Sequence, residues 1–217
     1  MTASPTTTRI GLFGGSFDPI HVGHLALLRA AEVALDLSRI ILMPTGRSWQ
    51  KSGQRTPAGD RLAMTRLAVR GHDRWEVDDR EVRRDGPSYT VDTLRSLRAE
   101  LGPDVVLVLL LGSDQLHNLH TWDRHTELFE LANLAITRRE QVALRDFPPP
   151  VEALVVKHGR DALSGSPAGE LVFFSMPAAP VSSTRLRQAL AAGEPVAELI
   201  PAAVLDYIRL NGLYRPT

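Results

Sequence analysis

The feature of this sequence that most constrains its fold is an unbroken aliphatic run from Val105 to Leu111. A strand with one solvated face alternates apolar and polar residues, whereas this run carries apolar side chains on both faces. Such a strand is typical of the middle of a parallel sheet that helices cover on both sides. The run is far too short to span a bilayer as a helix, which takes about 20 residues. Because parallel strands need long crossover connections, we expect helices and strands to alternate along the chain.

The remaining sequence shows that alternation. Further strands are predicted at Arg9–Phe13, Arg39–Met43, Trp75–Val82 (a strand or short hairpin), Leu134–Thr137 and Leu171–Ser175. Helices are predicted at Val22–Leu35, from Pro57 with Thr56 as N-cap, from a Ser or Thr cap near Tyr89 to Gly102, shortly after Gly112, at Asp123–Leu131, from the Val181–Thr184 segment to Gly193, and from Pro201. This order predicts an α/β protein with a doubly wound parallel sheet, in which ligands bind beyond the carboxyl ends of the strands.

Composition limits the domain organisation and the classes of partner. A chain of 217 residues that is 43% hydrophobic can bury one substantial core, so we expect a flexible tail over residues 1–8 and a single domain over 9–217, with a helical C-terminal segment from about 182. The formal net charge is +0, which gives no overall field to attract nucleic acid or a membrane surface. Cysteine is absent, so disulfides, thiolate nucleophiles and cysteine zinc sites are excluded. The threonine-rich N-terminus has no apolar signal core, and we expect a cytoplasmic location.

Two histidines stand three residues apart where the first helix begins. Gly14 and Gly15 end the preceding strand, and glycines there let a ligand approach the backbone closely. His21 and His24 can face the same way at the positive end of the helix, where anions bind. This arrangement favours a phosphate site. Alternatives from the residues alone are a helix cap with a packed core imidazole, or a zinc site that lacks an obvious third ligand.

The stretch "GGSFDPIHVGHL" resembles the H-x-G-H signature of the nucleotidyltransferase superfamily, and "VSSTRLR", from Val181 to Arg187, resembles the second signature of that superfamily. The resemblance implies a Rossmann-like nucleotidyltransferase fold in which the histidines bind the phosphates of ATP. Near the other end of the chain, hydroxyls, helix N-terminal amides and an arginine would hold the leaving pyrophosphate.

Four further segments resemble the bacterial nicotinate-mononucleotide adenylyltransferase family: "PSYTVDTL", "LLGSDQLHNLHTW", "LANLAITRR" and "YIRLNGLY". The resemblance extends from Arg9 to Tyr214. It implies catalytic roles for His21, His24, Lys51 and Arg187. It implies ATP contacts from Gly14, Gly15, Ser16, Phe17, His24, Gly112, Asp114, Ser183, Thr184 and Arg187, and nicotinate mononucleotide contacts from Lys51, Tyr89, Thr90 and Trp122.

Some of these residues also allow structural interpretations. Trp122 would stack on the pyridine ring, or else anchor two helices. Tyr89 and Thr90 would offer backbone N–H groups to the nicotinate carboxylate. Asp114 would contact a ribose, or else cap a helix.

Lys51 is one of only two lysines among 25 basic residues. An ordinary surface charge in this chain would be arginine, so a lysine here favours a compact charge on phosphate, although a surface lysine remains the alternative. The loop departs from the family pattern P-x-x-x-P-x-H-K, since Trp49 and Gln50 precede the lysine.

The implied reaction joins ATP to nicotinate mononucleotide and releases pyrophosphate. The acceptor phosphate is already largely dianionic at neutral pH, so no general base is required. We expect Mg²⁺ to be held by phosphates and water, with no metal ligand from the protein, because the sequence offers no acidic cluster. Open alternatives are nicotinamide mononucleotide or another phosphate acceptor such as phosphopantetheine, and a module that senses NAD precursors without turnover. The oligomeric state is not predicted.

Overall fold

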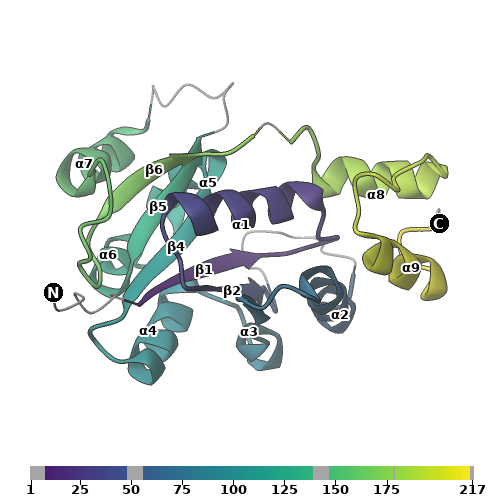
Figure 1. Ribbon diagram of the computed structural model, residues 1–217, viewed down its shortest axis with the longest axis horizontal. Coiled ribbons are helices and arrows are strands. Elements are labelled where there is room, and N and C mark those ends of the chain that lie inside the picture. Colours follow the sequence, from purple (N-terminus) through teal and green to yellow (C-terminus); the bar gives the residue numbers. More distant parts are fainter. Residues whose placement is uncertain (1–7, 48–55, 139–146, 178, 216–217) are drawn as a thin grey trace, which may run out of the picture. The chain divides into compact units, whose positions relative to one another are not determined.

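The computed structural model of the chain describes residues 8–47, 56–138, 147–177 and 179–215. Within these residues six strands form one sheet in the order β3-β2-β1-β4-β5-β6 (Figure 1). The strands are β1 (Arg9–Gly15), β2 (Arg39–Pro44), β3 (Trp75–Val77), β4 (Val106–Gly112), β5 (Asn133–Arg138) and β6 (Leu171–Ser175). The order matches the two-halved arrangement of dinucleotide-binding folds, in which the direction of winding reverses beside the first strand. The α/β, doubly wound prediction is confirmed.

The aliphatic run that begins at Val105 forms β4, and its residues from Val106 to Leu111 are buried. It pairs in parallel with β1 on one side and with β5 on the other, and β5 pairs in parallel with β6. Figure 1 shows β4, β5 and β6 side by side. Both faces of β4 are covered, which is why the strand has no polar alternation.

Helices follow the strands as the sequence predicts. The longer ones are α1 (Val22–Ala34), α2 (Ala58–Val69), α4 (Thr90–Leu101), α7 (Pro149–His158), α8 (Ser183–Ala192) and α9 (Ala202–Leu210). The short ones are α3 (Arg80–Arg83), α5 (Ser113–His117), α6 (Leu128–Leu131) and the 3₁₀ turns η1 (Leu119–Thr121) and η2 (His125–Glu127). The predicted glycine stops are confirmed, since Gly102 and Gly193 are the C-caps of α4 and α8 and have positive φ angles of 89° and 72°.

Four local predictions are wrong. Thr56 does not cap α2, whose N-cap is Pro57, and α4 begins after Tyr89 without a side-chain cap from Ser or Thr. The strand predicted over Trp75–Val82 ends at Val77, because the Asp78 carboxylate accepts bonds from the backbone and side chain of Arg80 and starts a helical turn. The helix predicted over Asp123–Leu131 is broken into η2 and α6.

The chain forms two compact units. The first comprises Met1–Phe13, Arg29–Ile40 and Tyr89–Pro177, and the second comprises Gly14–Leu28, Ile41–Ser88 and Ala178–Thr217. The prediction of one domain over 9–217 stays a prediction. None of the described helices is long and apolar enough to cross a membrane.

In the first unit, Arg98 of α4 links several loops through hydrogen bonds to their backbone carbonyls. Its guanidinium donates to the carbonyl oxygens of Gly102, Pro103, Val105, Leu131 and Pro167, at distances from 2.6 to 3.3 Å. Partial burial lowers the pKa of Arg98 from its usual value. Hydrogen bonds from a charged donor are stronger than those between neutral groups, so this one side chain holds several loops together.

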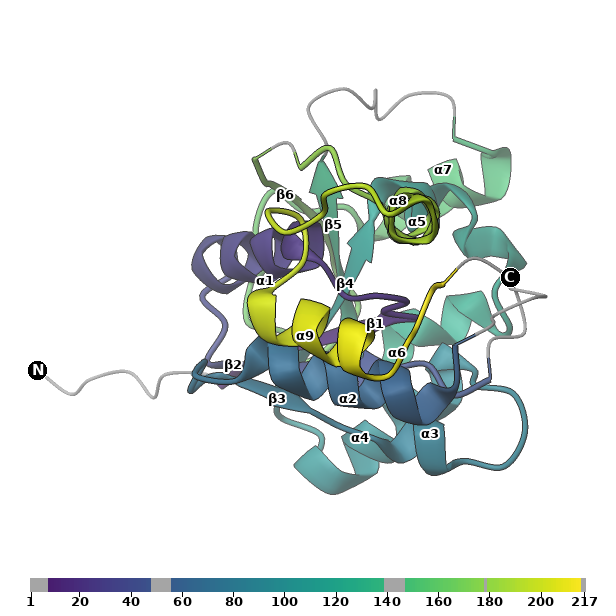
Figure 2. The same ribbon diagram turned by 90° about the vertical axis from the view of Figure 1, so that its right-hand side faces the viewer.

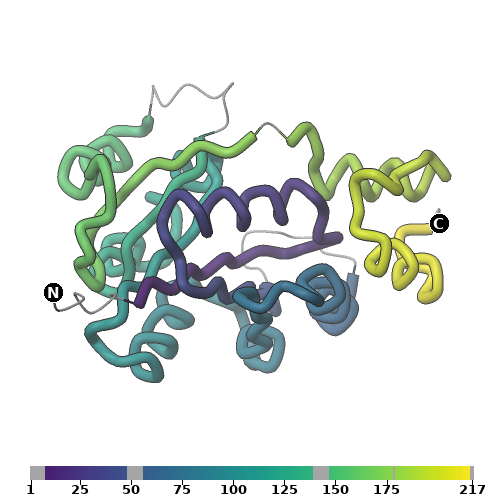
Figure 3. Tube along the Cα trace, in the orientation of Figure 1, coloured from purple at the N-terminus to yellow at the C-terminus, as the bar shows by residue number. Residues whose placement is uncertain are grey.

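In the second unit, the C-terminal helix packs against α2. Figure 2 shows α9 lying beside α2, and the Tyr207 hydroxyl of α9 donates to Asp60 of α2 at 2.8 Å. In the Cα trace of Figure 3, the yellow-green α8 leads through a turn into the yellow α9. The helical C-terminal segment predicted from about residue 182 is confirmed by these two helices.

Candidate active site

The predicted site residues fall into two groups, one in each unit. The second unit carries the residues from Gly14 to His24 together with Ser183, Thr184 and Arg187. The first unit carries Tyr89, Thr90, Gly112, Asp114 and Trp122. Lys51, Trp49 and Gln50 lie outside the described residues, so their predicted roles stay predictions.

The first signature occupies the turn between β1 and α1. The His21 side chain is 6% exposed, and its ring stacks on that of His24 with centroids 3.7 Å apart and planes 25° apart. The Phe17 ring meets His24 edge-on at 5.3 Å. The two imidazoles are thus held as one stacked pair at the start of a helix, as the spacing predicts. His24 is only partly buried, which speaks against the alternative of a packed core imidazole.

A backbone contact fixes the proton position on His24. The N–H of His21 donates to Nδ1 of His24 at 3.2 Å. A neutral imidazole has one donor and one acceptor nitrogen, so a neutral His24 that accepts at Nδ1 carries its proton on Nε2. Nε2–H is therefore the atom that His24 can offer to a phosphate oxygen.

The glycine inside the H-V-G-H sequence has a steric reason. A Cβ atom on Gly23 would stand 2.8 Å from Cγ1 of Val181 and 3.1 Å from the His21 ring. Such contacts are too close for a side chain at position 23. Gly23 therefore lets the second signature approach the histidine pair.

The second signature begins α8. Ser182 is the N-cap and its Oγ accepts from the backbone N–H of Arg185, as a capped helix start should. Ser183 Oγ donates to the carbonyl of Pro19 at 3.0 Å, and Arg187 Nη1 donates to the carbonyl of Asp18 at 2.8 Å. The two signatures, more than 160 positions apart, are in direct contact. The prediction that they meet is confirmed.

A buried charge cluster behind the first signature was not foreseen from the sequence. Asp18 is 6% exposed, and its Oδ1 accepts from the Tyr214 hydroxyl at 2.6 Å. Arg61 of α2 is 1% exposed and donates to the carbonyls of Ser16, Gly46 and Thr56. Desolvation lowers the pKa of Arg61, and the nearby Asp18 charge opposes that shift. The available signal was an arginine on the apolar side of a predicted helix.

Desolvation also raises the pKa of Tyr214 well above its ordinary value, and the hydrogen bond to Asp18 adds to the shift. The Tyr214 hydroxyl therefore keeps its proton, and donates it, throughout the neutral range. Burial and the bond to Asp60 raise the pKa of Tyr207 as well.

In the first unit, Gly112 ends β4 and Asp114 folds back over it. A Cβ atom on Gly112 would stand 2.5 Å from Oδ1 of Asp114, so a side chain at position 112 would displace the carboxylate from this position. Asp114 is not the N-cap of α5, because that position belongs to Gly112, so the capping alternative is wrong. The exposed carboxylate remains able to accept a hydroxyl, as a ribose contact requires.

Trp122 is half-buried and follows the 3₁₀ turn η1. Among the described residues no hydrogen-bond partner meets its buried Nε1. Tyr89 is the N-cap of α4, and Thr90 opens the helix, so the first backbone N–H groups of α4 lack intrahelical acceptors. Both features agree with the predicted binding roles without testing them.

Ion pairs connect these two elements of the first unit. Arg124 Nη2, just after Trp122, lies 2.6 Å from Asp92 in the first turn of α4, and Arg95 Nε lies 2.6 Å from Glu127. The segment that carries Trp122 is thereby tied to the helix that Tyr89 caps. Solvent screens exposed pairs of this kind strongly, so they orient the segment rather than stabilise it.

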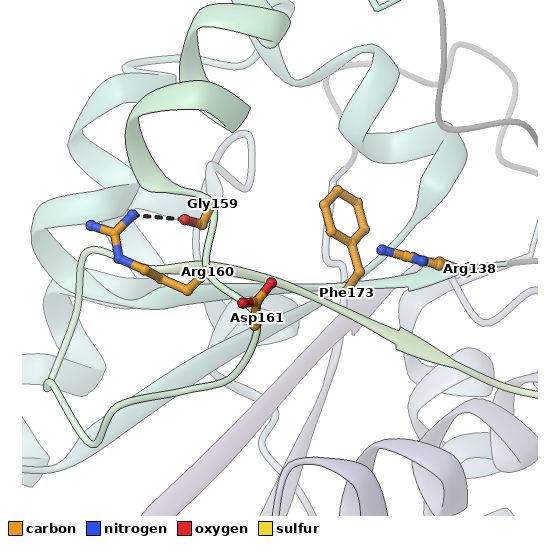
Figure 4. A pocket seen from close by; sticks show the side chains of 5 residues that line it. All are labelled: Arg138, Gly159, Arg160, Asp161 and Phe173. Carbon is orange, nitrogen blue, oxygen red and sulfur yellow. Dashed lines mark hydrogen bonds between the residues drawn. The ribbon is translucent and has the colours of Figure 1, made fainter.

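In the part of the chain that the structure describes, no group of three or more His, Asp or Glu side chains could hold a metal ion. An open cavity of about 410 Å³ in the first unit is lined by Arg138, Gly159, Arg160, Asp161 and Phe173. Figure 4 shows the Arg138 guanidinium beside the Phe173 ring, and Arg160 bonded back to the carbonyl of Gly159. None of the predicted site residues lines this cavity.

The fold and the joined signatures define the class of the protein: an α/β nucleotidyltransferase of the H-x-G-H type. Residues 12–189 match the cytidylyltransferase-like family. A protein of Chromobacterium violaceum with the name "Probable nicotinate-nucleotide adenylyltransferase" is 43% identical over 209 residues, which cover 95% of this chain and 99% of the relative. A protein of the same name from Pseudomonas syringae pv. tomato is 44% identical over 219 residues, which cover 99% of this chain and 96% of the relative.

The nicotinic acid mononucleotide adenylyltransferase of Plasmodium falciparum, solved in complex with NaAD, has the same fold, with a TM-score of 0.72, 20% identity, and coverage of 95% of this chain and 97% of that one. The chain belongs to the nicotinate-nucleotide adenylyltransferase family.

Proposed function

We propose that this chain transfers the adenylyl group of ATP to the 5′-phosphate of nicotinate mononucleotide, giving nicotinate adenine dinucleotide and pyrophosphate in NAD biosynthesis. The observation that supports it most directly is the contact between the two signatures, which gathers His21, His24, Ser183 and Arg187 in one unit. These are donors and cations without a paired carboxylate base, a set suited to polyanions rather than to hydrolysis.

The acceptor supplies its own nucleophile. A phosphate monoester with a second pKa of about 6 is mostly dianionic at neutral pH, so its oxygen can attack the α-phosphorus without a base. The bond from the α-phosphorus to the bridging oxygen breaks, and pyrophosphate leaves with the electron pair. The protein then has two tasks, namely holding two anions close together and offsetting the charge that moves toward the leaving group.

His24 Nε2–H, at the N-terminal end of α1, would donate to an oxygen of the reacting α-phosphate. Its Nδ1 is already occupied by the backbone N–H of His21, and that bond orients the ring before substrate arrives. Donors fixed in advance stabilise a developing charge without reorganisation. Arg187 and the start of α8, with Ser183 and Thr184, take the leaving pyrophosphate, and Lys51 adds a cation.

ATP brings Mg²⁺ with it as part of the substrate. The described side chains fit this, because the one carboxylate of the first signature, Asp18, is already bound by Tyr214 and faces Arg61. The metal would be held by phosphate oxygens and water and would offset charge on the triphosphate.

The nicotinate half of the acceptor would use the first unit. Trp122 stacks on the pyridine ring, and backbone N–H groups at the start of α4, near Tyr89 and Thr90, donate to the nicotinate carboxylate. Backbone N–H donors at this position favour the negatively charged carboxylate of nicotinate over the neutral amide of nicotinamide. Gly112 and Asp114, which are also in the first unit, contact ATP, with Asp114 on the ribose of the adenylyl group.

The test is a panel of acceptors with detection of released pyrophosphate. Wild-type protein with ATP and Mg²⁺ should release pyrophosphate fastest with nicotinate mononucleotide and more slowly with nicotinamide mononucleotide or phosphopantetheine. Fastest turnover with another acceptor would reject the assigned substrate. No pyrophosphate with any acceptor would favour the NAD-precursor sensor instead.

His24→Ala should lower kcat by ~100-fold or more, as expected for a preorganised electrostatic group. The matched control is His72→Ala, which removes an imidazole that stacks on Trp75 at 4.0 Å in the same unit. Near-normal turnover of a folded His24→Ala protein would contradict the role.

A further inference from the structure

The turn that carries the histidine pair is bound by the C-terminal part of the chain at four points, all within the second unit. Ser183 and Arg187 hold the carbonyls of Pro19 and Asp18, and the N–H of Val22 donates to the carbonyl of Leu199 at 3.1 Å. The fourth contact is the Tyr214 hydroxyl on Asp18, across 196 positions of sequence. It is the one of the four that reaches a charged side chain.

Two arginines lie near the Asp18 carboxylate and could pair with it. The Arg187 guanidinium already touches the Asp18 carbonyl, and Arg187 is near enough to Tyr214 to act on the phenol electrostatically. Arg61 stands on the buried side, where three of its five N–H groups donate to backbone carbonyls and its charge already acts on Asp18. Arg187, whose guanidinium lies against the backbone of Asp18, is the arginine that would turn toward the carboxylate.

A buried carboxylate that loses a hydrogen-bond donor favours a conformation in which another donor replaces it, because an unsatisfied charge is costly in a desolvated site. An Arg187–Asp18 ion pair would answer that need, with two parallel hydrogen bonds available from the guanidinium. Such a pair would withdraw Arg187 from an incoming triphosphate. The Tyr214 hydroxyl competes with this pairing, because it already donates to Oδ1 of Asp18.

We propose that Tyr214 is a positioning residue for ATP: by binding the Asp18 carboxylate it keeps Arg187 available to the triphosphate. The inference rests on the proposed adenylyl transfer for its readout. It assigns a role to the C-terminal "GLY" segment, whose tyrosine lies next to the first signature although it is almost the last residue that the structure describes.

The test compares Tyr214→Phe with Tyr207→Phe. Both variants lose one phenol hydroxyl that donates to an aspartate, at 2.6 and 2.8 Å, but the Tyr207 partner is Asp60 on α2 rather than Asp18. A merely structural loss should therefore lower the melting temperatures of both and leave both Michaelis constants alone. Positioning predicts that Tyr214→Phe alone raises KM for ATP, by about tenfold or more, with less than about twofold change in KM for nicotinate mononucleotide.

A second variant distinguishes the cause. Asp18→Asn removes the charge that would capture Arg187, so the double variant Asp18→Asn with Tyr214→Phe should recover most of the affinity for ATP that Tyr214→Phe loses. An unchanged KM for ATP in Tyr214→Phe, an equal rise for both substrates, or a double variant worse than the sum of its parts would each overturn the inference.

Failure of the proposed function looks different, because wild-type protein would then release no pyrophosphate at all. Tyr214→Phe is compared only with wild-type protein that is active.

Discussion

Arg61 offers the sharpest test of how the second unit is held together. Its side chain is 1% exposed, and its guanidinium donates to the carbonyls of Ser16, Gly46 and Thr56 at 2.8 to 3.3 Å. Replacement by methionine keeps most of the buried volume but removes every donor. Three carbonyls, one buried and two partly buried, then lose this donor, and the Asp18 carboxylate loses the neighbouring positive charge.

Removing one member of a buried charged network typically costs about 3–5 kcal/mol, since the groups left behind stay desolvated. For a chain of this length 1 kcal/mol lowers the melting temperature by about 2–4 °C, so Arg61→Met should melt about 6–20 °C below wild type. Urea unfolding followed by circular dichroism would give the free energy directly.

Arg66→Met is the control. Arg66 lies on the same helix, but its side chain is 55% exposed and its partner is the partly exposed Asp79, so the pair contributes about 1 kcal/mol or less. If Arg61→Met and Arg66→Met unfolded within about 1 kcal/mol of each other, the buried network would not carry the stability that we assign to it.

Two further outcomes follow from the site geometry. Trp122→Ala should raise KM for nicotinate mononucleotide by about tenfold, a loss typical of one aromatic stack, and should leave KM for ATP nearly unchanged; equal effects on both constants, measured in the same assay, would make the ring a structural anchor. Because the pKa of Tyr214 is raised by folding, the folded state holds its proton above pH 10 while the unfolded state loses it, so stability falls as the pH rises above about 10. Urea midpoints between pH 9 and 11 should fall more steeply for wild type than for Tyr214→Phe, and parallel profiles would refute the shift.

The sheet was predictable because its strands are short apolar runs with clear ends. Leu171–Ser175 has the predicted bounds, and β4 differs by one residue at each end. The strand predicted beyond Val77 failed because local bonds from Arg80 to Asp78 outweigh β-propensity, and such side-chain turns leave little trace in a hydrophobic pattern.

The candidate site was predictable where residues lie close together in sequence, and less so where they meet through the fold. Each of the two signatures can be recognised from residue types at a fixed spacing, and the structure shows that the two are in contact. The Asp18–Tyr214 bond connects residues 196 positions apart, and Arg61 is a charged residue in the core, where composition rules place apolar side chains. The Asp18–Tyr214 bond has no local sequence pattern, and the signal for Arg61 was its place on the apolar side of a predicted helix.

The close packing around Gly23 also limits which substitutions this protein can accept. A methyl group at position 23 would stand 2.8 Å from Val181 and 3.1 Å from the His21 ring, so a smaller residue at 181 would relieve the tighter of the two contacts. We therefore expect positions 23 and 181 to be coupled, and a library that varies both together should yield more active combinations than one that varies position 23 alone.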